Sequence, residues 1–567
     1  MGDAVDMPKA AGSWDHETDV LVVGAGGGMA GALMARDAGL DTLVIEKSAW
    51  VGGAAAYSGG TLWIFDNPFL RRAGHTDSKA QALRHFDAVV GEAGPAASPA
   101  RREAYVDGGL DLVELLTRHG VPLAHSGWAD YYADREGGIA AGRTLHALPF
   151  DFRELGEARG HVRPTQLVVA ANSVEIAQLA LGPRTPKAAL TWLRVGARQI
   201  GAKLRGADLR TRGQALMGRV YGAALKTGVE FWRETPLQSL IVENGRVVGA
   251  EVRRNGETVR VHARRGVLLS AGGFARNREL RTEHQAPAVG DWTMSTPEDT
   301  GDAIVAGQKV GAAIDLMDEA WWVPGTQPPG SMMLHVWDRC FPHLIFVDAK
   351  GERFVNEADP YMEVGQIMLK RQRELGAPGW MIIESRHRDS YAFGMTPPRM
   401  TPQAWFDSGY MRKANTLEEL AAKCNLDPSV FRASIERYNA MVRQGVDADF
   451  HRGDSTYNRF YGDAWVKPNP NLGAIEKAPF YAVSCVPGDV GTAGGLLADE
   501  HARVLTPSGD VIEGLYAAGN CSASVFGRAY PGAGSSIAAS MVFSLRAAQN
   551  MARQSADAAP LPVESAA

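Results

Sequence analysis

The hydrophobic and polar positions near the start of the chain follow the pattern of a strand, a helix and a second strand. Residues 19–23 (DVLVV) are continuously apolar after Asp19, which is typical of a strand buried on both faces. A glycine-rich turn at 24–28 leads into an apolar segment that ends near Ala38, and a second apolar run ends at Glu46. The pattern predicts a βαβ unit with a carboxylate after its second strand, which is the arrangement of a dinucleotide-binding fold.

A later part of the chain alternates between apolar and polar positions, from Ser239 to Leu269. Two Asn-Gly pairs, Asn244-Gly245 and Asn255-Gly256, divide it into three segments. Asn-Gly is the typical sequence of a two-residue hairpin turn, so we predict a three-stranded antiparallel meander. A short apolar run at 229–232 predicts a further strand before the meander.

The end of the chain returns to the first pattern. An apolar strand at 515–518 stops at Gly519-Asn520, a loop follows, and Ser535 opens an Ala-rich helix that runs to about Met551. Between these regions, from about residue 291 to 490, prolines, tryptophans and loops are dense.

These patterns predict an α/β protein in two domains. We expect a Rossmann-like dinucleotide-binding domain with an antiparallel β-meander, formed by residues 18–290 and 491–554, and an inserted α+β substrate and catalytic domain at 291–490. The terminal segments 1–17 and 555–567 are polar or rich in Ala and Pro, and we expect them to be disordered.

Composition narrows the class of function. The chain has 567 residues, which is too long for one core, and its net charge of -5 argues against general nucleic-acid binding. Its four cysteines have no metal-ligand spacing, so we expect no metal site and read them as reduced thiols of a cytoplasmic protein. The sequence also predicts neither a transmembrane helix nor a signal peptide.

One segment is strongly basic. Residues 184–226 carry ten Lys or Arg side chains against one acid, Asp208, in a pattern that predicts helices. A solvated helix face is the ordinary interpretation. Contact with an anionic membrane surface, which would place the protein peripherally at a membrane, is the functional alternative.

The glycines of the first turn indicate phosphate binding, because they let the backbone approach a pyrophosphate at a helix N-terminus. Met29 stands where the strict motif has its third glycine, so Gly28 or Gly31 would take the close-packing role. A second glycine-rich loop runs from Gly52 to Gly60, and such a loop favours a flavin over a nicotinamide. No histidine occurs at 54–57, so we expect the flavin to be bound non-covalently.

The loop after the last strand carries Tyr530-Pro531-Gly532-Ala533-Gly534. A tyrosine hydroxyl and a glycine amide four residues later could aim two donors at one carbonyl oxygen. A turn without chemistry is the alternative. Similarly, Tyr131 and Tyr132 are adjacent in a loop, where tyrosines are usually packing or surface residues.

Taken together, the chain resembles the 3-ketosteroid Δ1-dehydrogenases, within the flavin-dependent fumarate reductase and succinate dehydrogenase-like family, over about residues 18–552. The run ending at Glu357 and the 487–489 turn resemble the broad family, whereas Tyr530 to Gly534 resembles the more specific YPGPG of the ketosteroid enzymes. Ala533 replaces the second proline, and Arg528-Ala529 stands where members often have His-Thr.

The resemblance implies an FAD-dependent oxidoreductase that desaturates the A ring of 3-ketosteroids between C1 and C2. Tyr361 would be the base that removes the C2 proton, and Tyr131 would support it, with Tyr132 as a rival. Tyr530 and Gly534 would polarise the C3 carbonyl, and the C1 hydride would go to flavin N5. An external acceptor, a quinone or a dye, would reoxidise the flavin.

The residues expected to contact FAD are Gly24, Gly26, Gly27, Gly28, Met29, Glu46, Lys47, Gly53, Ala54, Ser58, Gly59, Gly60, Gly272, Gly519, Asn520, Ser535, Ser536 and Ile537. The alternatives are a Δ4-(5α)-ketosteroid dehydrogenase or a fumarate-type enoate reductase. A dicarboxylate reductase would recruit basic residues such as His343, Arg353 or Arg528. A non-enzymatic electron-transfer flavoprotein is the remaining reading.

Overall fold

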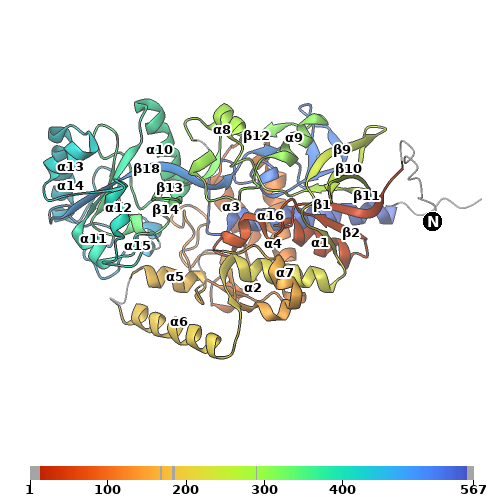
Figure 1. The fold of residues 1–567 in the computed structure, drawn as a ribbon, viewed down its shortest axis with the longest axis horizontal. Coiled ribbons are helices and arrows are strands. Elements are labelled where there is room, and N and C mark those ends of the chain that lie inside the picture. The colour runs from red at the N-terminus through yellow and green to blue at the C-terminus, as the bar shows by residue number, and fades with distance from the viewer. Residues whose placement is uncertain (1–12, 166–168, 182–184, 289, 395, 558–567) are drawn as a thin grey trace, which may run out of the picture.

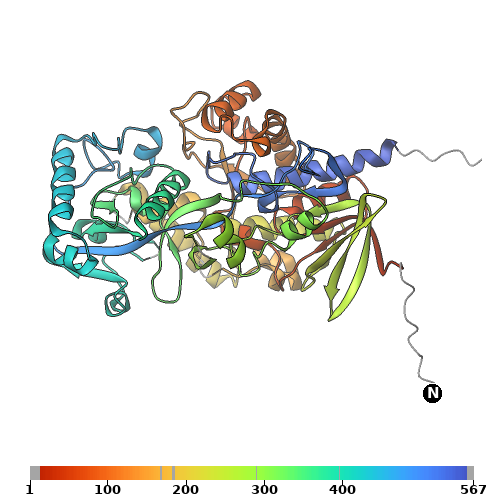
Figure 2. The same cartoon turned by 90° about the horizontal axis from the view of Figure 1, so that it is seen from above.

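The computed structural model describes residues 13–165, 169–181, 185–288, 290–394 and 396–557. Two β-sheets lie toward opposite ends of an elongated molecule, with helices packed around each (Figure 1). A second view shows the long strand β18 running from one end toward the other (Figure 2). Helices and strands are mixed throughout the chain, so the predicted α/β class is confirmed.

The first sheet has a parallel core in the order β21, β11, β1, β2, β8, with β20 antiparallel at its edge. The predicted βαβ unit is therefore present, with its strands next to each other. These strands are β1 (His16–Val23), β2 (Thr42–Ile45), β8 (Glu230–Trp232), β11 (Glu257–Leu269), β20 (Arg503–Leu505) and β21 (Val511–Ala517).

The predicted meander is present as β9 (Leu237–Glu243), β10 (Arg246–Arg254) and β11. Asn244 and Asn255 both have φ of 51°, the left-handed conformation that the first residue of such a turn requires. The end of β11 also pairs in parallel with β1 and β21, so one strand belongs to both the meander and the parallel core.

Helices cover the first sheet. They are α1 (Gly28–Asp37), α4 (Pro99–Arg118), α7 (Arg212–Lys226) and α16 (Ser535–Asp557). Helix α1 lies against α16, where a side chain at Gly31 would come within 2.6 Å of the Ser544 carbonyl oxygen. Gly31 thus takes a close-packing role, as the sequence suggested.

The second sheet is antiparallel, in the order β14, β13, β18, β16, β15, with β17 also paired to β18. Its strands are β13 (Ala320–Thr326), β14 (Met333–Leu334), β15 (Leu344–Val347), β16 (Gly379–Glu384), β17 (Met411–Ala414) and β18 (Phe480–Thr492). Its helices are α10 (Tyr361–Leu375), α11 (Ser385–Ser390), α12 (Gln403–Asp407), α13 (Leu417–Cys424), α14 (Pro428–Gln444) and α15 (Thr456–Tyr461).

Smaller elements complete the fold. The strands are β3 (Thr61–Trp63), β4 (Leu123–His125), β5 (Thr144–Ala147), β6 (Phe150–Asp151), β7 (Leu209–Arg210), β12 (Ile314–Asp315) and β19 (Gly495–Leu496). The helices are α2 (Pro68–Arg72), α3 (Lys79–Val89), α5 (Ser173–Ala180), α6 (Pro186–Leu204), α8 (Arg278–Gln285) and α9 (Asp302–Lys309). Helix α9 packs in the core of the first sheet, although it follows residue 291; the domain division at 291–490 remains a prediction.

The terminal segments differ in part from the prediction. Residues 1–12 and 558–567 lie outside the described residues. His16 and Glu17, which we expected in a disordered segment, belong to β1 because the strand continues its pairing with β11 to that point. Residues 555–557 extend α16.

The basic segment 184–226 is not one solvated helical face. Arg184 lies outside the described residues. Helix α7 is a core helix, and Arg219 lies over the Phe150 ring, with its guanidinium carbon 4.4 Å from the ring centroid. Helix α6 is the exposed part, and it extends along one edge of the molecule (Figure 1).

Candidate active site

A large cavity of about 1160 Å³ lies where the first sheet meets the second. One part is lined by backbone and polar groups of the first sheet, such as Gly24, Glu46 and Lys47. The other part is lined by apolar and aromatic side chains, such as Trp128 and Leu334. Typical sites for one small molecule measure roughly 300–1,000 Å³. The cavity therefore has room for a cofactor and a substrate together.

The glycines of the first turn form a cradle along this cavity. Gly24 has φ of 106°, and a side chain on it would come within 2.4 Å of the Ser270 carbonyl oxygen. A side chain on Gly27 would come within 2.0 Å of Ser540 Oγ. Only glycine fits at these positions, and their backbone stays open to a ligand at the N-terminus of α1, where the helix dipole favours a phosphate.

Glu46 lies directly after β2 at the same end of the cavity. Its Oε2 accepts a hydrogen bond from the Ala25 amide at 3.0 Å, and its Oε1 accepts one from the Ser48 amide at 2.9 Å. Burial raises the pKa of Glu46, while these amides and Arg163 act in the opposite direction. The carboxylate is thus fixed in orientation beside the cradle, as the ribose-binding role requires.

Most of the residues expected to contact a cofactor line the cavity. They are Gly24, Gly26, Gly27, Glu46, Lys47, Gly53, Ala54, Ser58, Gly59, Gly272, Asn520, Ser536 and Ile537. The ammonium group of Lys47 has its partners within the protein, because its Nζ donates to the Asp302 carboxylate at 2.7 Å and to Thr300 Oγ1 at 2.6 Å.

Five of the expected cofactor residues do not line the cavity: Gly28, Met29, Gly60, Gly519 and Ser535. Met29 is fully buried in the core under α1, because its helical position turns the side chain away from the cavity. Gly28, Gly60 and Gly519 are required by packing, since a side chain on each would clash with Val22, Arg212 and Ser540. Ser535 hydrogen-bonds Gly532 instead.

Replacing Glu46 by alanine is expected to weaken cofactor binding by about tenfold or more, because hydrogen bonds to a charged group contribute about 1.5–3 kcal/mol. Titration of the apoprotein with FAD, followed by flavin fluorescence, measures this affinity. Glu243→Ala, at an exposed position at the end of β9, is the matched control and should bind FAD normally. Unchanged affinity in Glu46→Ala would remove the residue from the cofactor site.

Buried tyrosines gather at the other end of the cavity. The ring centroid of Tyr361 lies 5.4 Å from that of Tyr131 and 5.2 Å from that of Tyr530. Behind Tyr131 lie Tyr457 at 4.8 Å and Tyr461 at 6.5 Å. These five residues are named the tyrosine cluster here, and they come from four separate parts of the chain.

The structure distinguishes the two adjacent tyrosines by position. Tyr131 lines the cavity and contacts Tyr361, whereas Tyr132 does not line it. The Arg135 guanidinium lies 5.1 Å from the ring centroid of Tyr132 instead. Tyr131 is therefore the member of the pair that is placed to act with Tyr361.

The electrostatics of Tyr361 differ from the expectation. Burial raises the pKa of Tyr361 well above its ordinary value, and the neighbouring Tyr131 and Tyr530 raise it further. We expected Tyr131 to stabilise the phenolate of Tyr361, but Tyr131 instead raises the pKa of Tyr361. The remaining favourable feature is the position of Tyr361 as the first residue of α10, at the positive end of the helix dipole.

Tyr530 and Gly534 both line the cavity next to this cluster. The Tyr530 hydroxyl lies 3.3 Å from Ser536 Oγ, and its ring centroid lies 5.3 Å from that of Trp321. Gly534 has φ of 95°, and a side chain there would come within 2.4 Å of the Thr61 backbone. The loop is therefore packed tightly against β3, which fixes the place of both groups.

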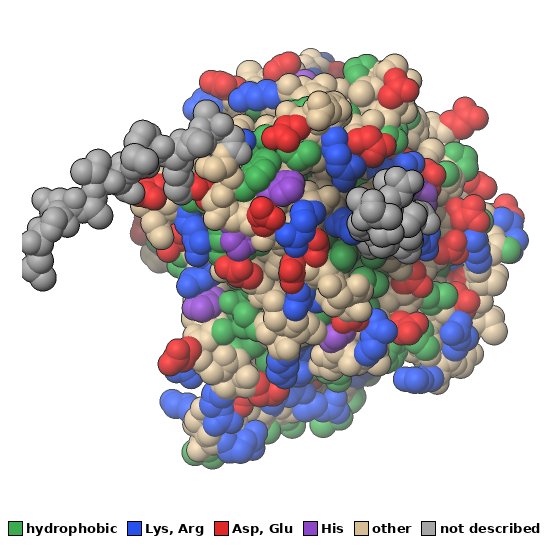
Figure 3. All heavy atoms as spheres, turned by 90° about the vertical axis from the view of Figure 1, so that its right-hand side faces the viewer, with side chains coloured by type: hydrophobic (Ala, Val, Ile, Leu, Met, Phe, Trp, Pro, Cys, Tyr) green, Lys and Arg blue, Asp and Glu red, His purple; other side chains and the backbone are tan. Residues whose placement is uncertain are grey.

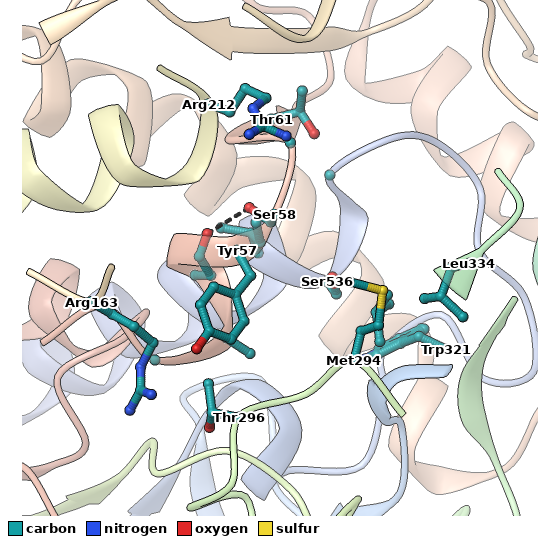
Figure 4. Close-up of a pocket in the computed structure, with 18 of the residues that line it drawn as sticks. Tyr57, Ser58, Thr61, Arg163, Arg212, Met294, Thr296, Trp321, Leu334 and Ser536 are labelled. Atoms are coloured by element: carbon teal, nitrogen blue, oxygen red, sulfur yellow. Dashed lines mark hydrogen bonds between the residues drawn. The ribbon is translucent and has the colours of Figure 1, made fainter. Parts of the chain in front are cut away.

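Several cavity residues were not found from the sequence. Figure 4 shows Arg163 and Thr296 near Tyr57, and Met294, Trp321 and Leu334 together on another side. Arg163 donates to Ser48 Oγ at 3.0 Å and to Glu298 at 2.9 Å. None of these residues belongs to a short motif, so only the three-dimensional fold identifies them.

The basic residues considered for a dicarboxylate site do not line the cavity. His343 contacts the Ala474 carbonyl oxygen at 2.8 Å. Arg353 pairs with Glu357 and Asp447, and Arg528 pairs with Asp318 and Glu319. The structure therefore offers no dicarboxylate clamp built from these three residues.

Comparison with known proteins identifies the family. Residues 19–537 match the model of the FAD binding domain family. The chain is 40% identical to a 3-oxosteroid 1-dehydrogenase of Mycobacterium tuberculosis (strain H37Rv) over 560 residues, which cover 95% of this chain and 99% of that protein. The chain belongs to the 3-oxosteroid 1-dehydrogenase family. The resemblance to the 3-ketosteroid Δ1-dehydrogenases is thus confirmed. The match to an FAD binding domain also confirms FAD as the predicted cofactor.

Two further comparisons show the breadth of the family. The structure of a 3-ketosteroid Δ1-dehydrogenase from Sterolibacterium denitrificans, in complex with 1,4-androstadiene-3,17-dione, has a TM-score of 0.90 and 36% identity, covering 95% of this chain and all of that one. A 4-oxocyclohex-2-ene-1-carboxylate 5-dehydrogenase of Sinomonas cyclohexanicum is 34% identical and covers 94% of both chains. The 3-oxosteroid 1-dehydrogenase family therefore has relatives named for a ring much smaller than a steroid.

Proposed function

We propose that this protein is an FAD-dependent enzyme that introduces the 1,2 double bond into the A ring of 3-ketosteroids. One observation carries the proposal. The same cavity joins a dinucleotide cradle at Gly24 and Glu46 to Tyr361, Tyr530 and Gly534, the groups that such a desaturation needs.

The chain's own residues would act on the substrate as follows. The C2 hydrogen of a 3-ketosteroid lies next to a ketone, so polarising the C3 carbonyl makes that hydrogen acidic. The Tyr530 hydroxyl and the Gly534 amide would donate hydrogen bonds to the C3 oxygen. Tyr361, supported by Tyr131, would take the C2 proton on its phenolic oxygen.

The cradle, the fixed Glu46 carboxylate and the size of the cavity fit FAD. Gly24, Gly26 and Gly27 would hold the pyrophosphate, and Glu46 a ribose. When bound, FAD supplies the hydride acceptor. No histidine stands at 54–57, which supports non-covalent binding. The electron acceptor that reoxidises the enzyme would be external, a quinone or a dye.

Anaerobic mixing with androst-4-ene-3,17-dione tests the proposal. We expect the visible absorption band of the flavin to bleach and a 1,4-dien-3-one product to form. If no 3-ketosteroid bleaches the flavin, while a fumarate-like acceptor oxidises the reduced enzyme, the proposal is wrong and the reductase reading replaces it.

A smaller ring is the alternative that the family itself raises. The substrate part of the cavity carries large apolar side chains, among them Trp128, Ile176, Leu334 and Trp337. These side chains can cover several fused apolar rings, whereas a single ring with a carboxylate would leave most of them uncovered. Supplying 4-oxocyclohex-2-ene-1-carboxylate in the same assay distinguishes the two, and we expect much slower bleaching with it.

Helix α6 supports a peripheral contact with a membrane. Its outer face carries Leu193, Ile200 and Leu204, which are 72%, 63% and 82% exposed. Basic side chains accompany them, at Lys187, Arg194, Lys203 and Arg205. Figure 3 shows Lys and Arg side chains beside hydrophobic ones along the lower edge of the molecule, at the level of α6 in Figure 1. An apolar face with a basic border is typical of a helix that lies on an anionic membrane.

The same helix borders the substrate cavity. Trp192, Val195, Gly196 and Gln199 of α6 line the cavity. A steroid dissolved in the bilayer would therefore reach the cavity beside the surface that contacts the lipid. Among the described residues, no helix is both long enough and apolar enough to cross a bilayer.

The double variant Leu193→Glu/Ile200→Glu is expected to reduce binding to anionic vesicles at least about tenfold, because burying each such side chain contributes about 1.5–3 kcal/mol. Liposome flotation measures the bound fraction. Val242→Glu/Val446→Glu, at two exposed apolar positions elsewhere, is the control and should float like the unmodified protein. If the unmodified protein does not float, the membrane contact is abandoned.

A further inference from the structure

Arg339 is a buried arginine whose charge is not paired within the described residues. It lies in the short helix Asp338–Cys340, and its side chain is fully buried. Its Nε donates to the His335 carbonyl at 3.0 Å, and its Nη1 donates to the Glu357 carbonyl. Its Nη2 has no acceptor in the part of the chain that the structure describes.

Two of the carboxylates around Arg339 pair with other cations, whereas the third, Asp359, hydrogen-bonds Asn356 and Asn458 and interacts with Arg339 through its charge. Asp338 accepts from His335 at 2.7 Å, and Glu357 pairs with Arg353 and Arg452 at 2.8 Å and 2.9 Å. A guanidinium keeps its charge at every pH at which proteins are folded. A buried charge is costly unless an opposite charge compensates it. The surroundings of Arg339 therefore favour the appearance of a nearby negative charge.

Hydrogen bonds tie Arg339 to the tyrosine cluster. Arg339 holds the carbonyl of Glu357, and Asn458, the neighbour of Tyr457, holds the carbonyl of Ala358 at 3.1 Å. Asn471 Nδ2 joins the carbonyls of Cys340 and Asn458, at 2.9 Å and 2.8 Å. These hydrogen bonds hold three segments together as one unit: the segment with Arg339, the segment before Tyr361, and helix α15.

The tyrosines form a continuous contact from this unit to the cavity. The Tyr457 ring lies 4.8 Å from the Tyr131 ring, which lies 5.4 Å from that of Tyr361. Burial raises the pKa of Tyr131, Tyr457 and Tyr461, and the positive charge of Arg339 acts against it in all three. A cation, Arg339, therefore lies near the tyrosine cluster but outside the cavity lining.

We propose that Arg339 is the cation that compensates phenolate charge in the tyrosine cluster and so enables Tyr361 to act as a base. The proposal rests on the proposed function, since it concerns the same proton transfer. Arg339 does not line the cavity, so it is a positioning residue that acts through Tyr457 and Tyr131. It supplies the stabilisation that Tyr131 alone does not give to Tyr361.

Other titratable groups surround Arg339 and can also affect the pH dependence that tests its role. They are Asp338, His335, Cys340, Glu357, Asp359, Arg452, Tyr131, Tyr457 and Tyr461. Burial raises the pKa of Asp359 to about 7, so this carboxyl can change its charge in the working range. The variant Asp359→Asn separates its contribution from that of Arg339.

The test is the pH dependence of anaerobic flavin reduction by androst-4-ene-3,17-dione, from about pH 6 up to the highest pH at which the enzyme retains its FAD. A nearby opposite charge lowers the pKa of an acid by about 1–3 units. Because the phenolate is the active form, Arg339→Met should move the rising limb of the profile up by about one unit. The rate then falls about tenfold below that limb and approaches the unmodified rate above it.

Further variants keep the test decisive. Arg339→Lys retains the charge and should restore part of the rate. Arg339→Gln retains an N–H donor without the charge, and it should show the same shift as Arg339→Met if the methionine variant does not fold. Asp359→Asn should leave the limb within about half a unit of its original position.

Arg101→Met is the matched structural control. Arg101 is also buried and donates to two carbonyls, those of Ala96 and Ala523, but it lies outside the tyrosine cluster. Its replacement should lower the thermal midpoint without moving the pH profile. An Arg339→Met or Arg339→Gln variant that retains FAD and is not slowed, or an Arg339→Lys variant that is slowed as much as Arg339→Met, would overturn the proposal. An unmodified enzyme that no 3-ketosteroid reduces would overturn the proposed function instead.

Discussion

Replacing Tyr361 by phenylalanine is expected to slow flavin reduction by a 3-ketosteroid about 10²- to 10⁴-fold, the range in which a general base contributes. The substitution removes only the hydroxyl. The ring keeps its contacts with Tyr131 and Tyr530, at 5.4 Å and 5.2 Å between centroids, so the cavity should keep its shape. Stopped-flow mixing under anaerobic conditions measures the rate, and the flavin absorbance beforehand shows whether FAD is retained.

Tyr132→Phe is the control for Tyr361→Phe. Tyr132 is half-buried, does not line the cavity and lies under Arg135, so its hydroxyl should contribute little to the rate. Comparison of the two variants separates loss of the base from a general response to removing a phenol near this loop. If Tyr361→Phe reduces its flavin at the unmodified rate, the base must be another group.

Tyr530→Phe should lower the maximal rate about 10²- to 10³-fold, the usual effect of removing one donor to a developing oxyanion. The substrate's apparent KM should change far less, because the ring remains in contact with Trp321 and the C3 oxygen carries little charge before the reaction. Steady-state kinetics with an artificial dye as acceptor give both quantities.

Tyr105→Phe provides the comparison for Tyr530→Phe. Tyr105 is fully buried, donates to the Trp63 carbonyl and does not line the cavity. Its loss should lower the thermal midpoint while leaving the maximal rate nearly unchanged. A Tyr530→Phe enzyme with a raised KM and an unchanged maximal rate would show that Tyr530 only binds the substrate. The double variant with Tyr361→Phe should lose less than the product of the two single effects, because both groups act on one transition state.

The sequence predicted the parts of the fold whose chemistry is local. The Asn-Gly turns at 244–245 and 255–256 specify a backbone that few other pairs adopt, so the meander was correct strand by strand. The glycines before α1 and the carboxylate of Glu46 are close in sequence to the strands that place them. For these elements, short-range constraints and tertiary structure agree.

The sequence was less informative where tertiary packing decides whether a side chain is buried or exposed. A high content of arginine suggested one exposed basic surface at 184–226, but Arg219 of α7 lies over Phe150 and donates to the Pro149 carbonyl. Long side chains of this type cover aromatic rings as readily as they face water. Charge composition alone does not distinguish an arginine that covers a ring from one that faces water. It therefore did not predict that α7 is buried while α6 is exposed.

The candidate site was predicted in part. Tyr361, Tyr530 and Tyr131 were found because they stand in or near recognisable motifs, and the structure brings them together. Tyr457 and Tyr461 belong to the same cluster but come from α15, which carries no motif. Arg163 and Arg339 were missed for the same reason, since their proximity to the site exists only after folding.

The arrangement of the first sheet also bears on how the protein is made. Strand β1 has β2 on one side and β11 on the other, and β11 in turn pairs with β21 at residues 515–517. During synthesis, β1 cannot complete its pairing until β11 has been made. The sheet is complete only when β21 has also left the ribosome, near the end of the chain. Contacts between such distant segments slow folding and leave strand edges exposed meanwhile. Ample FAD during expression should therefore raise the yield of correctly assembled protein, by trapping each chain as soon as its last strand arrives.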